Sequence, residues 1–235
     1  MFGRQKVAML VAEFLGAAVL SSVTLAMLGR TSFPFFVAVT AGVALATMSY
    51  LFGAHSNPAV TVGLWTMRKV QTTQAIVMVA AQMLGGLAAW QLNEYLLGGE
   101  IKNLAGEFDW RVLLAEAIGA FVLGLGVAVA VSKNYKDTAW AITLGASLFL
   151  GILVAGFASN GLLNPAVAVG VQSWSWAYAL GPVLGVIVGM SFYGILFAGR
   201  TIRLPRTKAT VVRAKAPARK VSAKKSAARK SAKKK

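Results

Sequence analysis

The sequence predicts an all-α membrane protein that consists of six transmembrane helices and two re-entrant half-helices, arranged as an inverted repeat. Three observations predict this fold. Hydrophobic residues make up 57% of the 235 residues and charged residues only 13%, which is well below the usual quarter. The hydrophobic residues form long runs instead of alternating with polar ones. Finally, two segments of the first half of the chain recur, slightly altered, in the second half.

Six apolar runs have the length of a membrane span, because a helix needs about 20 residues to cross about 30 Å of hydrocarbon. They lie at residues 7–28, 33–52, 75–97, 112–131, 139–158 and 177–198. The first run is too long for the hydrophobic region of a signal peptide and contains Glu13. We therefore interpret it as a retained span.

The two halves of the chain, about 7–100 and 109–199, resemble each other. AEFLGAAVL (12–20) matches AEAIGAFVL (115–123) at Ala, Glu, Gly, Ala, Val and Leu, and NPAVTVG of the first half recurs as NPAVAVG. Each half contains three spans, so the second half must insert upside down relative to the first. Inverted repeats place their functional centre at the midplane of the membrane, where broken helices from the two halves meet.

Each half contains one Asn-Pro-Ala tripeptide, called here a box. The first box is Asn57, Pro58 and Ala59, and the second box is Asn164, Pro165 and Ala166. The boxes begin short apolar segments at 58–67 and 165–173, and about ten residues make only about 15 Å of helix. Asn is a favoured N-cap and Pro is favoured at the first helical position. We therefore expect two half-helices whose N-termini meet inside a pore, since extended backbone at membrane depth must be buried or line a water-filled cavity.

Two facing half-helices would exclude ions. Their N-termini carry roughly +0.5 charge each, and a cation about 5 Å away is repelled by on the order of 3 kcal/mol at an effective dielectric constant near 20. The loss of the hydration shell adds a larger cost. A water that accepts hydrogen bonds from both Asn amides cannot also accept a proton. The alternative, that Asn-Pro begins ordinary buried helices, explains neither the half-length nor the pairing.

Several motifs connect the sequence to a known family. They are the two boxes, AEFLGA with AEAIGA, HSNPAVTVGLW, AQMLGG (81–86) and LGPVLG (180–185). Together they resemble the aquaporin, or major intrinsic protein, family over about residues 7–199. The resemblance implies an aquaporin-like bundle, a homotetramer with one pore in each protomer, and passive conduction of water or small uncharged solutes.

One position departs from the family pattern. Most family members have an Arg directly after the second box, whereas this chain has Val167. By resemblance, the other positions of the selectivity filter are Ile152, Gly161 and either Val37 or Ala41. The side chains around the constriction would then be small and apolar, without a fixed positive charge. We therefore expect a filter that is wider and less polar than in most family members and that admits glycerol-like molecules, ammonia or other small neutral solutes besides water. A hydrophobic gate is the alternative interpretation.

Polar groups beside the boxes have expected roles of their own. The resemblance implies that backbone carbonyls of Ala54, His55 and Leu162 line the pore. It also implies that Glu13 and Glu116, which lie at matching positions of the repeat, brace the re-entrant loops by accepting backbone hydrogen bonds. Intramembrane carboxylates are functional suspects, so a proton-coupled transporter that uses Glu13 and Glu116 is the alternative function.

Other classes of site and function find no support in the sequence. The chain has no cysteine and a single histidine, so we expect no metal site and no cofactor. No nucleophile–base pair suggests an enzyme.

The distribution of Lys and Arg predicts the orientation. Arg68 and Lys69 lie in one short connection and Lys133 and Lys136 in another, and the N-terminus is also basic. This excess places both termini in the cytoplasm, and we expect the protein to lie in the cell membrane. Residues 200–235 form a separate basic tail without acidic residues. We expect the tail to be disordered and to contact anionic lipid headgroups, with nucleic acid as the less favoured partner.

Overall fold

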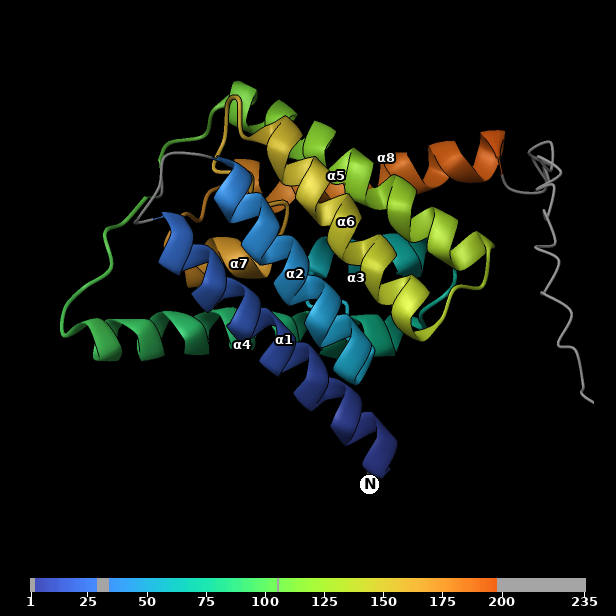
Figure 1. The fold of residues 1–235 in the computed structure, drawn as a ribbon, viewed down its shortest axis with the longest axis horizontal. Helices are drawn as coiled ribbons and strands as arrows, with labels where there is room; N and C mark the ends of the chain where they lie inside the picture. Colours follow the sequence, from blue (N-terminus) through green and yellow to red (C-terminus); the bar gives the residue numbers. More distant parts are fainter. Residues whose placement is uncertain (1–2, 29–33, 105, 198–235) are drawn as a thin grey trace, which may run out of the picture. The chain divides into compact units, whose positions relative to one another are not determined.

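The computed structural model describes residues 3–28, 34–104 and 106–197. The basic tail lies outside these residues. The described chain is entirely helical apart from its connections (Figure 1). The helices are α1 (Arg4–Leu28), α2 (Pro34–Phe52), α3 (Pro58–Thr66), α4 (Thr72–Leu97), α5 (Trp110–Ser132), α6 (Asp137–Ala155), α7 (Pro165–Gly170) and α8 (Trp176–Leu196).

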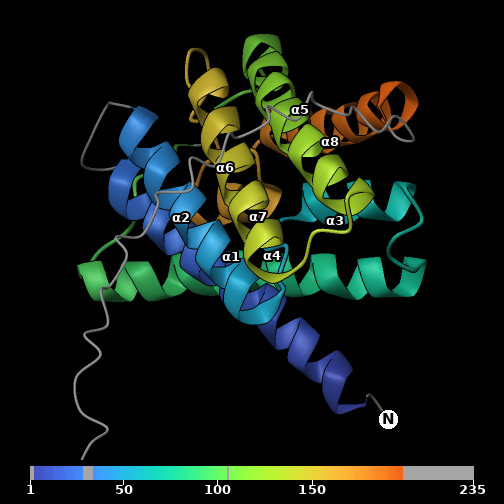
Figure 2. The same ribbon diagram turned by 45° about the vertical axis from the view of Figure 1, so that its right-hand side comes forward.

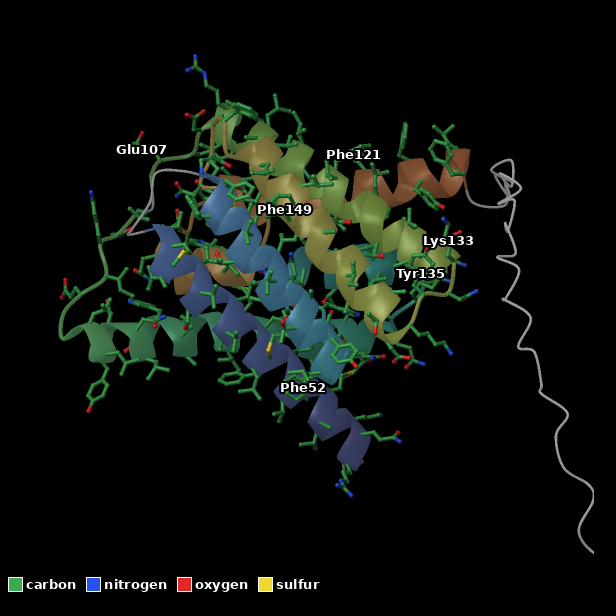
Figure 3. The ribbon with its side chains drawn as sticks, in the orientation of Figure 1. Phe52, Glu107, Phe121, Lys133, Tyr135 and Phe149 are labelled. Carbon is green, nitrogen blue, oxygen red and sulfur yellow. The ribbon has the colours of Figure 1, made fainter. Side chains whose placement is uncertain are left out.

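Six of these helices are long and apolar enough to cross a membrane, and α3 and α7 are too short to do so. The predicted fold class is therefore confirmed. Large apolar side chains such as Val43, Ile76 and Leu96 are exposed on the outer faces of the long helices, where lipid replaces water. Apart from Glu13 and Glu116, the charged groups of the described residues lie near helix ends or in connections: Lys133 lies over the ring of Tyr135 in the α5–α6 connection (Figure 3).

The predicted boundaries differ from the observed ones at a few helix ends. The half-helix α7 ends at Gly170, three residues before the expected end. Gln172 has a left-handed φ of 57°, which turns the chain away from the helix axis. The span α6 ends at Ala155 instead of residue 158, because residues 156–158 form a turn. These changes leave the order of the elements as predicted.

The pairing of the helices repeats in the two halves. In the first half α1 packs against α4, in the second half α5 packs against α8, and α2 packs against α6 across the halves. The short helices cross over: α3 packs against α8 of the other half, and α7 packs against α4 and α1. Figures 1 and 2 show α3 and α7 lying among the long helices. The two boxes are thereby brought towards each other.

Glycines make the closest helix contacts. Gly181, Gly185 and Gly189 follow one another at four-residue intervals on α8, and a Cβ at any of them would collide with a backbone carbonyl of α5. Such spacing of small residues lets membrane helices approach closely. The contact fixes α8, which in turn supports α3.

Candidate functional site

Each box begins a half-helix in the way the sequence predicts. Pro58 and Pro165 occupy the first helical turn, and the side chains of Asn57 and Asn164 cap the helices. Asn57 Oδ1 accepts from the backbone N–H of Ala59 at 2.9 Å. Asn164 Oδ1 accepts from the N–H of Ala166 at 3.0 Å. The N-cap prediction is therefore confirmed for both boxes.

The two boxes are joined by a reciprocal pair of hydrogen bonds. Asn57 Nδ2 donates to the carbonyl of Leu163 at 2.9 Å, and Asn164 Nδ2 donates to the carbonyl of Ser56 at 2.7 Å. Each accepting carbonyl belongs to the residue directly before the opposite box. An Asn amide has two N–H donors, so this bond uses one donor of each Asn and leaves the other.

The residues that supply these carbonyls have an unusual backbone conformation. Ser56 has a φ of 54° and Leu163 a φ of 51°, a left-handed conformation that costs a non-glycine residue roughly 1–2 kcal/mol. This conformation turns each carbonyl towards the opposite box. A net gain of about 1 kcal/mol per buried hydrogen bond offsets part of that strain.

Glu13 and Glu116 hold the extended chain before each box. Glu13 accepts from the N–H groups of His55 at 2.9 Å and Ser56 at 2.8 Å. Glu116 accepts from those of Leu162 at 3.0 Å and Leu163 at 2.6 Å. Both carboxyl groups are fully buried. They thus supply acceptors for backbone donors that have no helical or strand partner.

Further side chains complete these two networks, and the sequence interpretation did not assign them. Gln82 Nε2 donates to Glu13 at 2.6 Å and to Thr61 Oγ1 at 2.9 Å. Ser159 Oγ donates to Glu116 at 2.8 Å and accepts from the N–H of Gly161 at 3.0 Å. The one available signal was an amide inside an apolar span, at Gln82.

The expected filter residues come from four parts of the fold, namely three helices and the loop before α7. Val37 and Ala41 lie one turn apart on α2, Ile152 on α6 and Val167 on α7, and all four belong to one buried apolar cluster. Gly161 has a φ of 62° and lies against Ile152: a Cβ added to Gly161 would be 3.1 Å from Ile152 Cγ2. The side chains that surround the expected filter residues are therefore apolar, as the filter residues themselves are.

The three expected carbonyl positions differ in their surroundings. Ala54 is buried and its carbonyl accepts from Ser49 Oγ at 2.6 Å, so one of its two lone pairs is already used. The imidazole of His55 lies 3.5 Å from Thr61 Oγ1 and 3.7 Å from Glu13 Oε1. Leu162 is buried directly beside Gly161.

Comparisons with known proteins agree with this architecture. Residues 4–193 match the family described as Major intrinsic protein. The chain is 31% identical over 191 residues to "Aquaporin NIP1-1" of Oryza sativa subsp. japonica, covering 74% of this chain and 67% of that protein. It is 30% identical over 208 residues to "Putative aquaporin NIP4-1" of Arabidopsis thaliana, covering 82% and 73%. The fold is similar to the X-ray structure of the aquaglyceroporin from Plasmodium falciparum, with a TM-score of 0.67, 21% identity and coverage of 81% and 96%.

Proposed function

Because the chain belongs to the major intrinsic protein family, and is therefore a membrane channel for water or small neutral solutes and not an enzyme, we propose that its solutes pass the two boxes in single file. The observation that carries this proposal is the reciprocal bonding of Asn57 and Asn164. It fixes both amides and leaves each with one N–H for a passing solute.

Selection against ions follows from the chemistry of the boxes. A passing water that accepts from both amides keeps its own hydrogens for neighbouring waters, so it cannot accept a proton there. Cations meet amide donors and the N-termini of α3 and α7. The cost of stripping water from an ion is the larger barrier. Neutral solutes avoid both costs.

We also propose that the narrow part of the pore has an apolar selectivity filter. Its residues are Val37 or Ala41, Ile152, Gly161 and Val167, with the carbonyls of Gly161 and Leu162, and of Ala54 and His55 beyond the boxes, as the polar groups. Val167 replaces the Arg expected after the second box. A filter without a fixed cation accepts the carbon face of a glycerol-like molecule more readily, and carbonyls accept from its hydroxyl groups. Ammonia is neutral and small, and its N–H groups can donate to the same carbonyls.

The contacts of the two buried glutamates do not favour a proton-coupled carrier. Each carboxylate accepts two backbone N–H groups and one side-chain donor. A group that must bind and release a proton during transport would break these bonds in every cycle. We therefore propose that Glu13 and Glu116 brace the loops.

Stopped-flow light scattering of proteoliposomes tests the proposed function. Wild-type vesicles should pass water and re-swell in a glycerol gradient, without saturation and without dependence on a pH gradient. Val167→Arg should lower the glycerol flux about tenfold, because a guanidinium fills and charges the constriction; Val167→Leu controls for size without charge. Wild-type vesicles that pass water but reject glycerol and urea would refute the apolar filter. Saturable, proton-driven flux would refute the channel.

The remaining features of the proposal concern the whole assembly. We propose a homotetramer in the cell membrane, with both termini in the cytoplasm and a channel domain at 1–199. The family match, which ends at residue 193, supports the domain limit. The basic tail at 200–235 would contact anionic lipid headgroups, and nucleic acid is the less favoured partner. Deleting residues 205–235 should leave the flux unchanged.

A further inference from the structure

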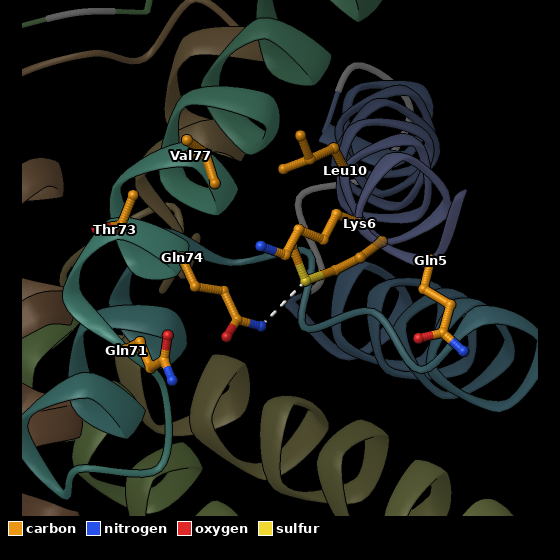
Figure 4. Close-up of a pocket in the computed structure, with 8 residues that line it drawn as sticks. Gln5, Lys6, Leu10, Gln71, Thr73, Gln74 and Val77 are labelled. Atoms are coloured by element: carbon orange, nitrogen blue, oxygen red, sulfur yellow. Dashed lines mark hydrogen bonds between the residues drawn. The ribbon is translucent and has the colours of Figure 1, made fainter. Parts of the chain in front are cut away.

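A pocket lies between the first turns of α1 and α4, away from the boxes (Figure 4). Its volume is about 320 Å³. Eight residues line it, four from each helix region: Gln5, Lys6, Met9 and Leu10, and Gln71, Thr73, Gln74 and Val77. None of these eight residues is acidic.

The lining of this pocket is amphipathic. Lys6 supplies a cation, Thr73 a hydroxyl and Gln74 an amide, whereas Leu10 and Val77 form an apolar wall one turn further along each helix. Figure 4 shows the Lys6 side chain extending towards α4, and the Gln5 amide turned away from it. A ligand that fits this lining carries a negative group beside an apolar chain.

The amide of Gln74 is poorly satisfied within the protein. Its Nε2 donates to Met9 Sδ at 3.0 Å, and a thioether sulfur is a weak acceptor. Next to the pocket, Trp65 Nε1 donates to Thr72 Oγ1 at 3.0 Å and holds the start of α4. An anionic oxygen entering the pocket would give the Gln74 amide a stronger acceptor than Met9 does.

The position of the pocket at the start of two candidate spans corresponds to the depth expected for phospholipid headgroups. Both α1 and α4 begin at it, and both are candidate membrane spans, so their first turns lie on one side of the bilayer, the side that we propose to be cytoplasmic. Val11 and Ile76, just beyond the pocket on the same two helices, are 49% and 64% exposed and face the lipid. Arg68 and Lys69 in the connection before α4 add positive charge.

We propose that this pocket binds an anionic phospholipid, with the headgroup phosphate on Lys6, Thr73 and Gln74 and the acyl chain along Leu10 and Val77. Basic pockets between membrane helices on the cytoplasmic side are suited to such headgroups. The apolar wall selects a lipid over free phosphate. The site does not depend on which solute the pore conducts.

Thermal unfolding of the full chain in detergent tests the site. Added phosphatidylglycerol should raise the melting temperature of the wild type, whereas phosphatidylcholine and inorganic phosphate should not. In a titration, Lys6→Gln should weaken the apparent affinity for phosphatidylglycerol about tenfold and Thr73→Val about threefold. Lys133→Gln is the matched control, because it removes a charge at the same proposed side but outside the pocket, and it should leave the affinity unchanged.

The outcomes separate the sources of an effect. Equal weakening by Lys6→Gln and Lys133→Gln would show unspecific attraction and overturn the site. An equal rise in melting temperature with phosphatidylcholine or with inorganic phosphate would also overturn it. Lys6→Gln, Thr73→Val and Lys133→Gln should each conduct like the wild type in phosphatidylcholine vesicles. This result would show that the variants are folded, and it keeps the test independent of the proposed solute.

Discussion

The first box is held by a side-chain network that links three helices, whereas the second box relies on Glu116 of α5, on Ser159 of its own loop and on close backbone packing. In the first half, Gln82 on α4 links Glu13 on α1 to Thr61 on α3. In the second half, Ser159 of the loop serves Glu116.

The half-helices are supported in equally different ways. A Cβ at Gly86 of α4 would collide with the carbonyl of Ala166 in α7, so these two backbones are in contact. Where α3 of the first half packs against α8, Gly63 instead meets the side chains of Val186 and Met190.

The difference shows which features the site requires. Both halves share the capping Asn, the left-handed residue before it, the glutamate that accepts two backbone N–H groups and the bond to the opposite box. These features fix the two amides. The side chains around them differ, so we infer that several packing arrangements can support one geometry.

Removing a bracing carboxylate should have the largest effect. Glu116→Leu leaves two backbone N–H groups without their acceptor, at about 1–3 kcal/mol for each group, and leaves Ser159 Oγ with only the carbonyl of Ala155. The sum, on the order of 5 kcal/mol, is comparable with the total stability of a typical protein. We expect no folded channel by size-exclusion chromatography. Glu107→Leu, at an exposed loop position, should fold normally; a well-folded Glu116→Leu channel would contradict the bracing role.

Placing valine at the contact that supports α7 should have the next largest effect. Gly86→Val should cost about 3 kcal/mol, because backbone atoms cannot move aside. It should lower the melting temperature by about 6–12 °C for a chain of this size and reduce flux strongly. Leu84→Val on the exposed face of α4 is the control. Val186→Ala, which removes side-chain support from α3, should cost less, about 2 kcal/mol; the reverse order would refute the comparison.

Separate networks should give additive effects. Gln82→Leu removes donors to Glu13 and Thr61 and should cost about 2 kcal/mol, and Ser159→Ala should cost about 1–2 kcal/mol. Their double variant should equal the sum of the singles within about 0.5 kcal/mol, as measured by melting temperature. The effects of Gln82→Leu and Thr61→Val should instead be less than additive, because each substitution breaks the same hydrogen bond between Gln82 and Thr61. Strong coupling between Gln82 and Ser159 would show that the two halves share one network.

The imidazole of His55 should contribute least. Its distances of 3.5 Å to Thr61 and 3.7 Å to Glu13 are too long for good hydrogen bonds, whereas its backbone N–H binds Glu13. His55→Gln should therefore change stability by about 0.5 kcal/mol, the usual range for a side chain without a special role. A melting temperature as low as that of Gln82→Leu would place the imidazole within the network.

Much of the fold could be predicted from the sequence because its signals are local. Span length, the Asn-Pro start of each half-helix and the repeated glutamate are each readable within a few residues. The predicted end of α7 was wrong by three residues, because nothing in the sequence indicates that Gln172 has a left-handed backbone conformation. The same holds for Ser56 and Leu163, whose carbonyls carry the bonds between the boxes.

The side-chain networks depend on the rotation of helices about their axes, which local patterns do not determine. Gln82 meets Glu13 only because α4 packs on α1 in one register, and it meets Thr61 because α3 lies beside both. The filter positions at Ile152 and Gly161 were assigned by resemblance and not by pattern. They stay predictions, together with Val37, Ala41 and Val167, until flux measurements test them.

The bonds between the boxes also constrain the biosynthesis of the chain. When the ribosome has completed α4, Leu163 has not yet been translated. The amide of Asn57 therefore lacks its hydrogen-bond acceptor, the carbonyl of Leu163, at the bilayer centre, where water is scarce. The nascent first half is thus an unfinished intermediate whose re-entrant segment cannot settle alone. Closure of the site awaits insertion of the second half, which makes its assembly a late and cooperative event.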